Sequence, residues 1–351
     1  MIIHSNPLRK MTVAALLFLG IASCQKEQPL TTAAPETNTK STASLVVGPA
    51  PVIMWWSTGP SIPYTDDIPG DVPRNNQFPV GFAINGKGYV CGSILTTGWN
   101  TGDYIHDLWE FDPATQTWTK KAPFPGAVPI EASSFVIGDN AYIVVSNATY
   151  QYNQPTNTWT SRASVPAVVR DLATAFAING KGYLGLGNEF DANLTQLNDW
   201  WQYDPIADTW TKKNNFPGSK RSGAGGFAVG GKGYVVSGEH FANGHGNWVN
   251  DVWQYNPAGD SWVRKADFAG PGRWEPIAVN GTINGVDLGF IAGGDNDENA
   301  FNDVWQYNPL TDTWGKLTNI LGGARTEAAG FVINHSLCIV NKSCVSLNWS
   351  K

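Results

Sequence analysis

Four arginines that recur along the chain are the side chains with the clearest spacing for chemistry. They stand at steps of 51, 52 and 52 residues, as Arg170, Arg221, Arg273 and Arg325. Glutamates occupy the position two residues further on, or its equivalent, at Glu131, Glu275 and Glu327. Guanidinium groups bind carboxylate, phosphate or sulfate through paired hydrogen bonds, so the set predicts an anion-binding ring. The alternative is that each arginine pairs with a glutamate or a backbone carbonyl and only joins neighbouring units.

A second group of candidate ligand-binding residues falls in segments of unequal length, 92–107, 187–199, 238–251 and 293–303. The strongest members are Glu239, His240, His245 and Trp248. A tryptophan beside acidic and amide groups is a common way to hold a sugar, by stacking and hydrogen bonding. The alternative is that they are ordinary polar residues on solvent-exposed loops and bind no ligand.

A weak calcium candidate lies in the last of these segments. Asp295, Asp297 and Asn299 alternate as at the start of a calcium-binding loop. The glycine expected at the sixth position is missing, and Gln306 stands where the twelfth position needs glutamate. The chain also has no Cys-x-x-Cys motif for zinc, so no cofactor is expected.

The candidate residues belong to a repeat of about 50 residues, which redefines the expected fold. Trp109-Glu-Phe-Asp-Pro-Ala-Thr-Gln-Thr-Trp118 recurs as Trp201…Trp210, Trp253…Trp262 and Trp305…Trp314, with a weaker copy at Tyr150…Trp159. Phe82-Ala-Ile-Asn-Gly-Lys-Gly-Tyr recurs ahead of it, for example at Phe176 and Phe227. Short apolar strands with an Asn-Gly turn between them predict a β-hairpin, and each unit reads as four strands. Such a unit buries its aromatic faces only by stacking on copies of itself, as in a β-propeller.

These motifs resemble the kelch family, including the central domain of galactose oxidase, over residues 52–340. The resemblance implies an all-β propeller with four antiparallel strands per blade, and six candidate first strands along the chain predict six blades. Trp55 and Trp56 lie in a segment that imitates a fourth strand without the preceding three. We therefore expect this N-terminal strand to close the ring as the outer strand of the sixth blade.

The C-terminal unit departs from the pattern. After Phe331 the chain lacks the Gly-Lys-Gly-Tyr element, the glycine step and the Asp-x-Trp motif. Two readings stay open: the last blade is truncated or altered, or it is a divergent closing blade.

The N-terminal residues predict export and lipidation. Arg9 and Lys10 precede an apolar run, 13–21, which is too short for a membrane span and suits a signal peptide. Ile21-Ala-Ser-Cys24 resembles the lipobox of bacterial lipoproteins, which implies a lipid anchor on Cys24. The expected organisation is a leader at 1–23, Cys24 with a flexible tether at 24–51, and the propeller at 52–351. Gln25 after the cysteine favours the outer membrane of a Gram-negative bacterium.

Charge excludes one class of partner. The chain has 23 Lys+Arg against 29 Asp+Glu, a formal charge of −6, and removal of Arg9 and Lys10 with the leader makes it −8. A basic footprint for nucleic acid is therefore missing.

Three cysteines remain after the lipidated one, namely Cys91, Cys338 and Cys344. An exported protein permits disulfides, and adjacent first and sixth blades would bring Cys91 towards either partner. The odd number and irregular spacing favour buried or free thiols.

The leading functional hypothesis is a lipid-anchored kelch propeller that binds a glycan or protein on its loop-rich face. The galactose oxidase copper site needs paired histidines, two tyrosines and a cysteine crosslink, which plain kelch blades do not supply. A second hypothesis is an enzyme resembling bacterial sialic acid mutarotases, in which an arginine holds the carboxylate and a glutamate or histidine moves the anomeric proton. A third is a structural scaffold, in which the arginines are neutralised internally.

Overall fold

The computed structural model describes residues 43–46, 51–63, 75–98, 101–190, 195–242, 245–341 and 343–350. All of them belong to one compact unit, residues 40–351. The predicted leader, Cys24 and most of the predicted tether lie outside the described residues. Within the described ranges the regular structure is entirely β-strand, and no helix there is long and apolar enough to cross a bilayer.

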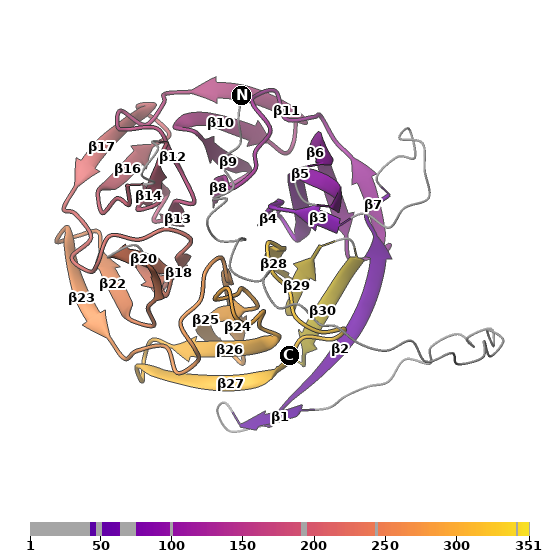
Figure 1. Ribbon diagram of the computed structural model, residues 1–351. Coiled ribbons are helices and arrows are strands. Elements are labelled where there is room, and N and C mark those ends of the chain that lie inside the picture. Colours follow the sequence, from indigo (N-terminus) through magenta and orange to yellow (C-terminus); the bar gives the residue numbers. More distant parts are fainter. Residues whose placement is uncertain are drawn as a thin grey trace, which may run out of the picture. The chain divides into compact units, whose positions relative to one another are not determined.

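Six antiparallel sheets, the blades, surround a central axis (Figure 1). From the axis outwards, the first three blades consist of β4 (Val80–Ile84), β5 (Lys87–Gly98), β6 (Thr101–Asp112) and β7 (Thr117–Lys120); β8 (Ser133–Ile137), β9 (Asn140–Val145), β10 (Ala148–Asn153) and β11 (Thr158–Arg162); and β13 (Thr174–Ile178), β14 (Lys181–Gly185), β16 (Trp200–Asp204) and β17 (Thr209–Lys213). The last three consist of β18 (Gly225–Val229), β19 (Lys232–Val236), β22 (Val252–Asn256) and β23 (Ser261–Lys265); β24 (Ile277–Ile283), β25 (Val286–Ala292), β26 (Asp303–Asn308) and β27 (Thr313–Asn319); and β28 (Ala329–Ile333), β29 (Ser336–Val340), β30 (Ser343–Trp349) and β2 (Pro51–Ser61). The predicted six-bladed propeller is therefore confirmed.

Short strands extend some blades at the loop-rich face. They are β3 (Asn75–Gln77) on β5, β12 (Arg170–Asp171) with β15 (Asn188–Glu189), and β20 (Glu239–Ala242) with β21 (His245–Trp248).

The Asn-Gly turns of the inner hairpins have the predicted geometry. Asn85 and Gly86 have φ of 48° and 73°, and Asn179 and Gly180 have φ of 50° and 74°. A type I′ turn requires positive φ at both central residues, which asparagine and glycine adopt at least cost.

The second glycine of the Gly-Lys-Gly-Tyr element allows neighbouring blades to approach. A Cβ at Gly182 would lie 2.2 Å from the ring of Phe135 in blade two, and one at Gly233 would lie 2.1 Å from Phe176 in blade three. Gly88 with Phe331 and Gly289 with Phe227 repeat the arrangement. A side chain at these glycines would displace the phenylalanine that seals the interface.

The closing tryptophan of each unit joins its blade to the preceding one. Trp210 Nε1 donates to the carbonyl of Ala163 at 2.9 Å, and the Ala163 N–H donates to Asp208 Oδ1 at 2.9 Å. The same tryptophan bond recurs at Trp159, Trp262 and Trp314. The repeat thus encodes contacts between blades as well as strands within them.

The N-terminal strand closes the ring as predicted. β2 pairs antiparallel with β30, with Trp56 opposite Leu347, and Trp118 of blade one donates to the carbonyl of Pro60 at 3.0 Å. One correction applies to the predicted tether: residues 43–46 form β1 (Ala43–Val46), which pairs with β2 as a fifth strand.

The sixth blade is complete in strand number but divergent in sequence. Leu337 is fully buried at a position that is glycine in blades one and three. It packs in one cluster with Val279 of blade five, which stands where the other blades have the phenylalanine that contacts this glycine. A larger residue on one side is matched by a smaller one on the other, so the interface stays filled. The C-terminal unit is therefore a divergent closing blade, the second of the two predicted alternatives.

Candidate functional site at the mouth of the central channel

One residue of each blade, just before or near the start of the innermost strand, has a left-handed backbone at the loop-rich end of the channel. We call these six residues, with φ of 45° to 59°, the mouth ring: Phe78, Glu131, Leu172, Gly223, Glu275 and Glu327. Successive N–H groups donate around it, from Leu172 to the Glu131 carbonyl (3.1 Å), from Gly223 to Leu172 (3.0 Å) and from Glu275 to Gly223 (2.8 Å). A left-handed non-glycine residue costs about 1–3 kcal/mol, so the surrounding packing must hold this geometry.

The mouth ring encloses a hollow of about 160 Å³. Its lining consists of the six ring residues and the residue that follows each of them. Below it the channel is lined by small side chains or glycine from the innermost strands, including Gly81, Ser134, Gly226 and Gly330. The channel below the mouth therefore offers few side-chain functional groups, and the carboxylates are concentrated at the mouth.

Glu131, Glu275 and Glu327 lie at the mouth, where their place in the repeat predicted them. Three of the six ring positions are thus carboxylates. Carboxylate oxygens that are open to the hollow can accept hydrogen bonds from hydroxyl or ammonium groups of a ligand.

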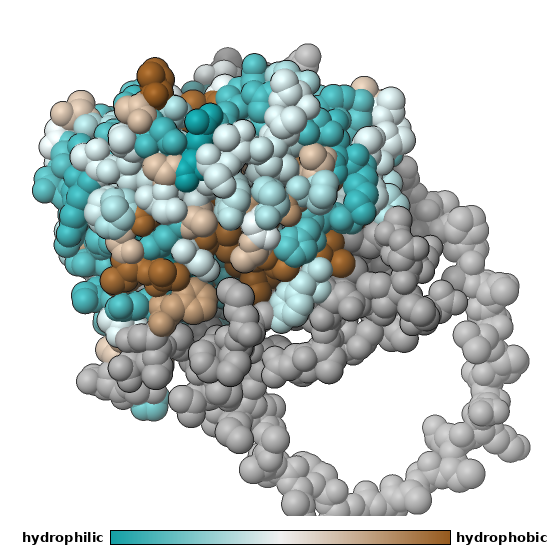
Figure 2. Space-filling model, turned by 90° about the horizontal axis from the view of Figure 1, so that it is seen from above, coloured by the Kyte–Doolittle hydropathy of each residue, from teal (hydrophilic) through white to brown (hydrophobic). Residues whose placement is uncertain are grey.

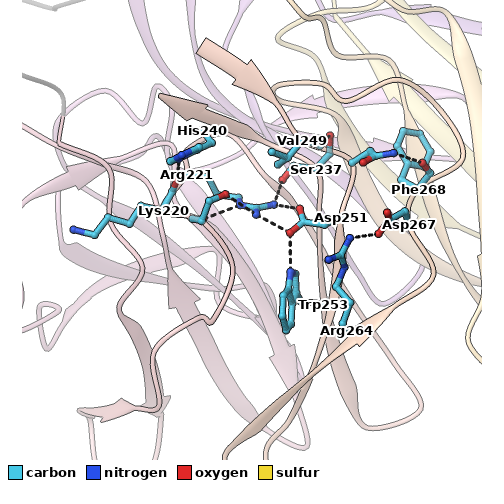
Figure 3. A network of polar contacts seen from close by, with 12 residues as sticks. Lys220, Arg221, Ser237, His240, Val249, Asp251, Trp253, Arg264, Asp267 and Phe268 are labelled. Atoms are coloured by element: carbon cyan, nitrogen blue, oxygen red, sulfur yellow. Dashed lines mark hydrogen bonds and ion pairs between the residues drawn. The ribbon is translucent and has the colours of Figure 1, made fainter. Parts of the chain in front are cut away.

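The arginines do not face the hollow, and Arg221 shows why. Its guanidinium lies inside blade four, fully buried, between the carbonyl of Ser237 and the carboxylate of Asp251 (Figure 3). Nη1 donates to Oδ1 of Asp251 at 2.5 Å and Nη2 donates to Oδ2 at 2.9 Å. Trp253 Nε1 also donates to this carboxylate, at 2.8 Å, and Arg221 stacks over Phe216.

Arg170 and Arg273 are clamped in the same way, by Asp199 and Asp303 of their own blades. Arg170 is 2% exposed and Arg273 is 0% exposed. The prediction that these arginines form an anion-binding ring is therefore wrong for Arg170, Arg221 and Arg273. Each guanidinium group pairs with an aspartate two residues before the blade's tryptophan and also donates to a backbone carbonyl. The alternative of internal pairing therefore holds in its backbone-carbonyl part, with aspartate in place of the expected glutamate.

Each clamp stabilises the ionised form of its aspartate. Burial raises the pKa of Asp251, but the hydrogen bonds and charge of Arg221 and the indole N–H of Trp253 outweigh it, so the pKa lies below the ordinary 3.8. The pKa values of Asp199 and Asp303 are lowered by the same balance. The clamps are consequently intact at neutral pH.

Arg325 differs from the other three. It is half-buried, and its guanidinium donates to backbone carbonyls of its own loop, those of Leu321, Gly322, Gly323 and Ala324. Register places Ser343 where blades three to five have the clamping aspartate, so blade six lacks that partner. Arg325 therefore braces a loop.

The other predicted ligand-binding residues gather on one hairpin above blade four, formed by β20 and β21. Glu239 is buried, whereas His245 is exposed and Trp248 is half-buried. Glu239 pairs in register with Trp248, and His240 Nδ1 lies 2.8 Å from the carbonyl of Lys220. None of the four lines the hollow, so the structure separates them from the mouth glutamates.

The calcium candidates form a tight loop beside blade five. Asp295 is bridged to Trp274 and to Ala300, and Asp297 has a left-handed backbone. Among the described residues, no three His, Cys, Asp or Glu side chains lie close enough to share a metal ion. Asp295, Asp297 and Asn299 therefore gain no further acidic ligand from this region.

Two features of the loop-rich face escaped the sequence prediction. Asp171, next to the ring residue Leu172, is mostly buried opposite Asn188, and burial raises its pKa to about 6 although a hydrogen bond from Asn188 opposes the rise. Trp274 fills the space of the absent side chain at Gly223, where a Cβ would lie 2.2 Å from its ring. The usable signal was that Asp171 and Trp274 each directly follow one of the repeated arginines, Arg170 and Arg273.

The three described cysteines have the state that their irregular spacing favoured. Cys91, Cys338 and Cys344 are all buried free thiols. Cys91 lies in a hydrophobic cluster of blades one and two, whereas the other two lie in the cluster between blades six and one.

Comparisons with known proteins agree with this architecture. A family model described as Kelch motif matches residues 290–319, which span most of β25 to β27. The N-acetylneuraminate epimerase of Pasteurella multocida is 35% identical over 79 residues, 22% of this chain and only 20% of that protein's length. A solved structure titled "Structure of YjhT" matches with a TM-score of 0.61 and 17% identity, covering 80% of this chain and 99% of the other. The chain therefore carries a Kelch motif in one of its six four-stranded blades, and its fold is similar to that of the matched propeller structure.

Proposed function

We propose that this chain is a lipid-anchored envelope protein that binds a carbohydrate in the hollow at the mouth ring. The observation that carries the proposal is the hollow itself, with Glu131, Glu275 and Glu327 around it at the loop-rich end of a rigid channel. Because backbone hydrogen bonds of the ring hold Glu131 and Glu275 in place before a ligand arrives, little ordering of these two residues is needed on binding.

The lining suits a small polyhydroxylated ligand. Carboxylates accept hydrogen bonds from hydroxyl groups, while Phe78 and Leu172 offer apolar contact to the C–H face of a sugar ring. The hollow of about 160 Å³ is smaller than the ~300–1,000 Å³ of ordinary ligand pockets. It fits one terminal sugar unit better than an extended glycan.

A structural scaffold would also bury Arg170, Arg221 and Arg273, so those residues give no support for binding. The case for a ligand therefore rests on the mouth glutamates.

A second candidate, a sugar mutarotase or epimerase, is favoured by the 79-residue similarity to the N-acetylneuraminate epimerase. In mutarotation one carboxyl group protonates the ring oxygen while a carboxylate takes the proton of the anomeric hydroxyl, and the bond from the anomeric carbon to the ring oxygen breaks. Asp171, beside the mouth ring, has a pKa of about 6 and so exchanges protons near neutral pH. Burial of the three clamped arginines favours a sugar without a carboxylate.

The envelope location is part of the proposal. It is supported by the apolar run at 13–21 and by the lipobox-like Ile21-Ala-Ser-Cys24. Mass spectrometry of the N-terminal peptide from the native host tests it: a diacylglycerol-modified Cys24 is expected, and an unmodified leader would contradict it.

Saturation-transfer NMR on residues 25–351 tests carbohydrate binding, with matched neutral, amino and acidic monosaccharides. Transfer to a neutral or amino sugar is expected, together with its loss in the variant E275Q/E327Q. Glu298→Gln, on an exposed loop of blade five, is the matched control and should keep the signal. Transfer that persists in the double variant would remove the mouth from the proposal, and transfer to no sugar would leave a protein partner or a scaffold. Faster anomer exchange with the wild type would make the protein an enzyme.

A further inference from the structure

Two of the buried cysteines lie on the same face of one hairpin of the closing blade. Cys338 lies in β29 and Cys344 in β30; the register places Cys338 opposite Ser346 and Val340 opposite Cys344. The cysteines are thus diagonal neighbours on one face of the sheet. Ser346 Oγ lies 3.3 Å from the Cys338 sulfur and 3.5 Å from the Cys344 sulfur, so both thiols contact the same hydroxyl group.

The other blades fill these two positions with larger side chains. Register places Cys338 where other blades have a tyrosine opposite the phenylalanine of the innermost strand, namely Tyr89, Tyr142, Tyr183 and Tyr234. It places Cys344 where three blades have Leu108, Trp200 and Val252. Blade six thus has two small thiols at neighbouring positions where other blades have larger side chains, and close packing alone does not require cysteine there.

We propose that Cys338 and Cys344 are oxidised to a disulfide that ties β29 to β30. The thiolate of Cys344 attacks a low-molecular-weight or protein disulfide and forms a mixed disulfide, releasing one thiol of the oxidant. The thiolate of Cys338 then attacks the Cys344 sulfur and releases the second thiol. The chain loses two protons and two electrons, and the oxidant disulfide is reduced to two thiols.

The position of the pair determines when this reaction takes place. In the closed ring Cys338 is 1% exposed and Cys344 is 0% exposed. β2 covers Cys344 at an irregular stretch of its pairing with β30, where Gly59 lies so close that a Cβ would be 3.3 Å from that of Cys344. Because β2 is the N-terminal strand docking on the last hairpin, the thiols are open to an oxidant until the ring closes and are protected afterwards.

The disulfide would strengthen the edge on which ring closure depends. β30 is the strand that pairs with β2, and β29 and β30 together fill the interface between blades six and one. Closing this short loop should raise the thermal midpoint of the protein by on the order of 5 °C.

Peptide mapping of the full chain tests the inference directly. Trypsin cuts after Arg325 and Lys342, so Cys338 falls in peptide 326–342 and Cys344 falls in peptide 343–351. The chain is refolded with oxidised glutathione, its free thiols are alkylated, and the digest is kept unreduced. A linked 326–342/343–351 species that separates on reduction is expected. Both peptides alkylated, or either one linked to Cys91, would overturn the inference.

Serine variants separate the disulfide from other effects of oxidation. Wild type and Cys91→Ser should melt at a higher temperature after oxidative than after reductive refolding. Cys338→Ser and Cys344→Ser should show no such difference. Persistence of the difference in either variant would contradict the assignment. Oxidised glutathione added to the already folded, reduced protein should form the link far more slowly than during refolding; equal rates would refute the protection by β2.

Discussion

Arg221 in blade four and Arg325 in blade six occupy the same place in the repeat but perform different tasks. Arg221 is fully buried and clamped by Asp251, whereas Arg325 is half-buried and donates to carbonyls of its own loop. The difference comes from one distant residue, because blade six has Ser343 where blade four has the aspartate. A repeated residue type therefore does not guarantee a repeated role; the identity of its partner decides the direction in which the side chain points.

Removing the two guanidinium groups should expose this contrast most strongly. Arg221→Ala leaves the Asp251 carboxylate in a mostly buried position without its counter-charge, and we expect a loss of about 3–5 kcal/mol in the free energy of unfolding. Arg325→Ala removes hydrogen bonds at a partly exposed site and should cost about 1 kcal/mol or less. Chemical denaturation of both variants measures the difference. Equal losses would mean that the ion pair adds nothing to the clamp.

The next largest effect compares two carboxylates of the loop-rich face, one with an arginine and one without. Burial raises the folded-state pKa of Asp171 to about 6, above its ordinary 3.8, so the folded protein binds this proton more tightly than the unfolded chain does. Its contribution to stability is therefore greatest below pH 4 and is lost as pH rises to about 6, by about 3 kcal/mol in all. The clamped Asp251 acts in the opposite sense, because its lowered pKa adds stability that is lost as pH falls.

Asp171→Asn should accordingly be more stable than wild type at pH 8 and lose that advantage at pH 4. Denaturation curves at intervals across this range give the measurement. If the free energies of unfolding of Asp171→Asn and wild type differ by the same amount at every pH, the pKa of Asp171 is not raised in the folded state.

A smaller effect concerns the tryptophan beside each clamp. Trp253→Phe removes the indole N–H that donates to Asp251 at 2.8 Å, a bond to a charged group, and should cost about 1.5–3 kcal/mol. Trp262→Phe removes a bond of 3.2 Å to the neutral carbonyl of Asn214 and should cost about 0.5–1.5 kcal/mol. The thermal midpoints of the two variants rank them, and the reverse order would count against charge assistance.

The smallest effect restores the missing partner. Ser343→Asp offers Arg325 a carboxylate at the position that clamps Arg221, and a double-mutant cycle with Arg325→Ala should give a coupling of at most about 1 kcal/mol. The gain is limited because Arg325 must give up its loop carbonyls. A coupling as large as that of the buried pairs would mean that the aspartate alone is sufficient to build a clamp.

The repeat made the propeller predictable because its markers fall at fixed structural positions. Asn85-Gly86 needs a turn with positive φ, and Trp210 needs a carbonyl on the preceding blade. The double tryptophan at Trp55 and Trp56 likewise revealed the closing strand. β1 was missed because residues 43–46 lie in a stretch whose composition resembles a linker, and pairing with β2 supplies the order that composition does not.

The candidate site was predictable in position but not in orientation. Spacing placed Arg273 and Glu275 together at the mouth, yet one side chain turns into the blade and the other lines the hollow. Side chains two residues apart in the repeat therefore point in different directions. Only Asp303, two residues before Trp305, indicates that the arginine side chain turns into the blade. The left-handed backbone of the mouth ring had no sequence signature, because residues as different as Phe78 and Gly223 adopt it.

The hydrogen bonds that run from Glu275 through Gly223 and Leu172 to Glu131 form an arc made of main chain alone. The width of the opening along that arc is therefore independent of which side chains stand on it. A substitution at Glu131, Leu172 or Glu275 alters the charge and shape presented at the opening without altering its frame. Related propellers can thus exchange ligands by changing a few ring side chains while the blades and their contacts stay as they are.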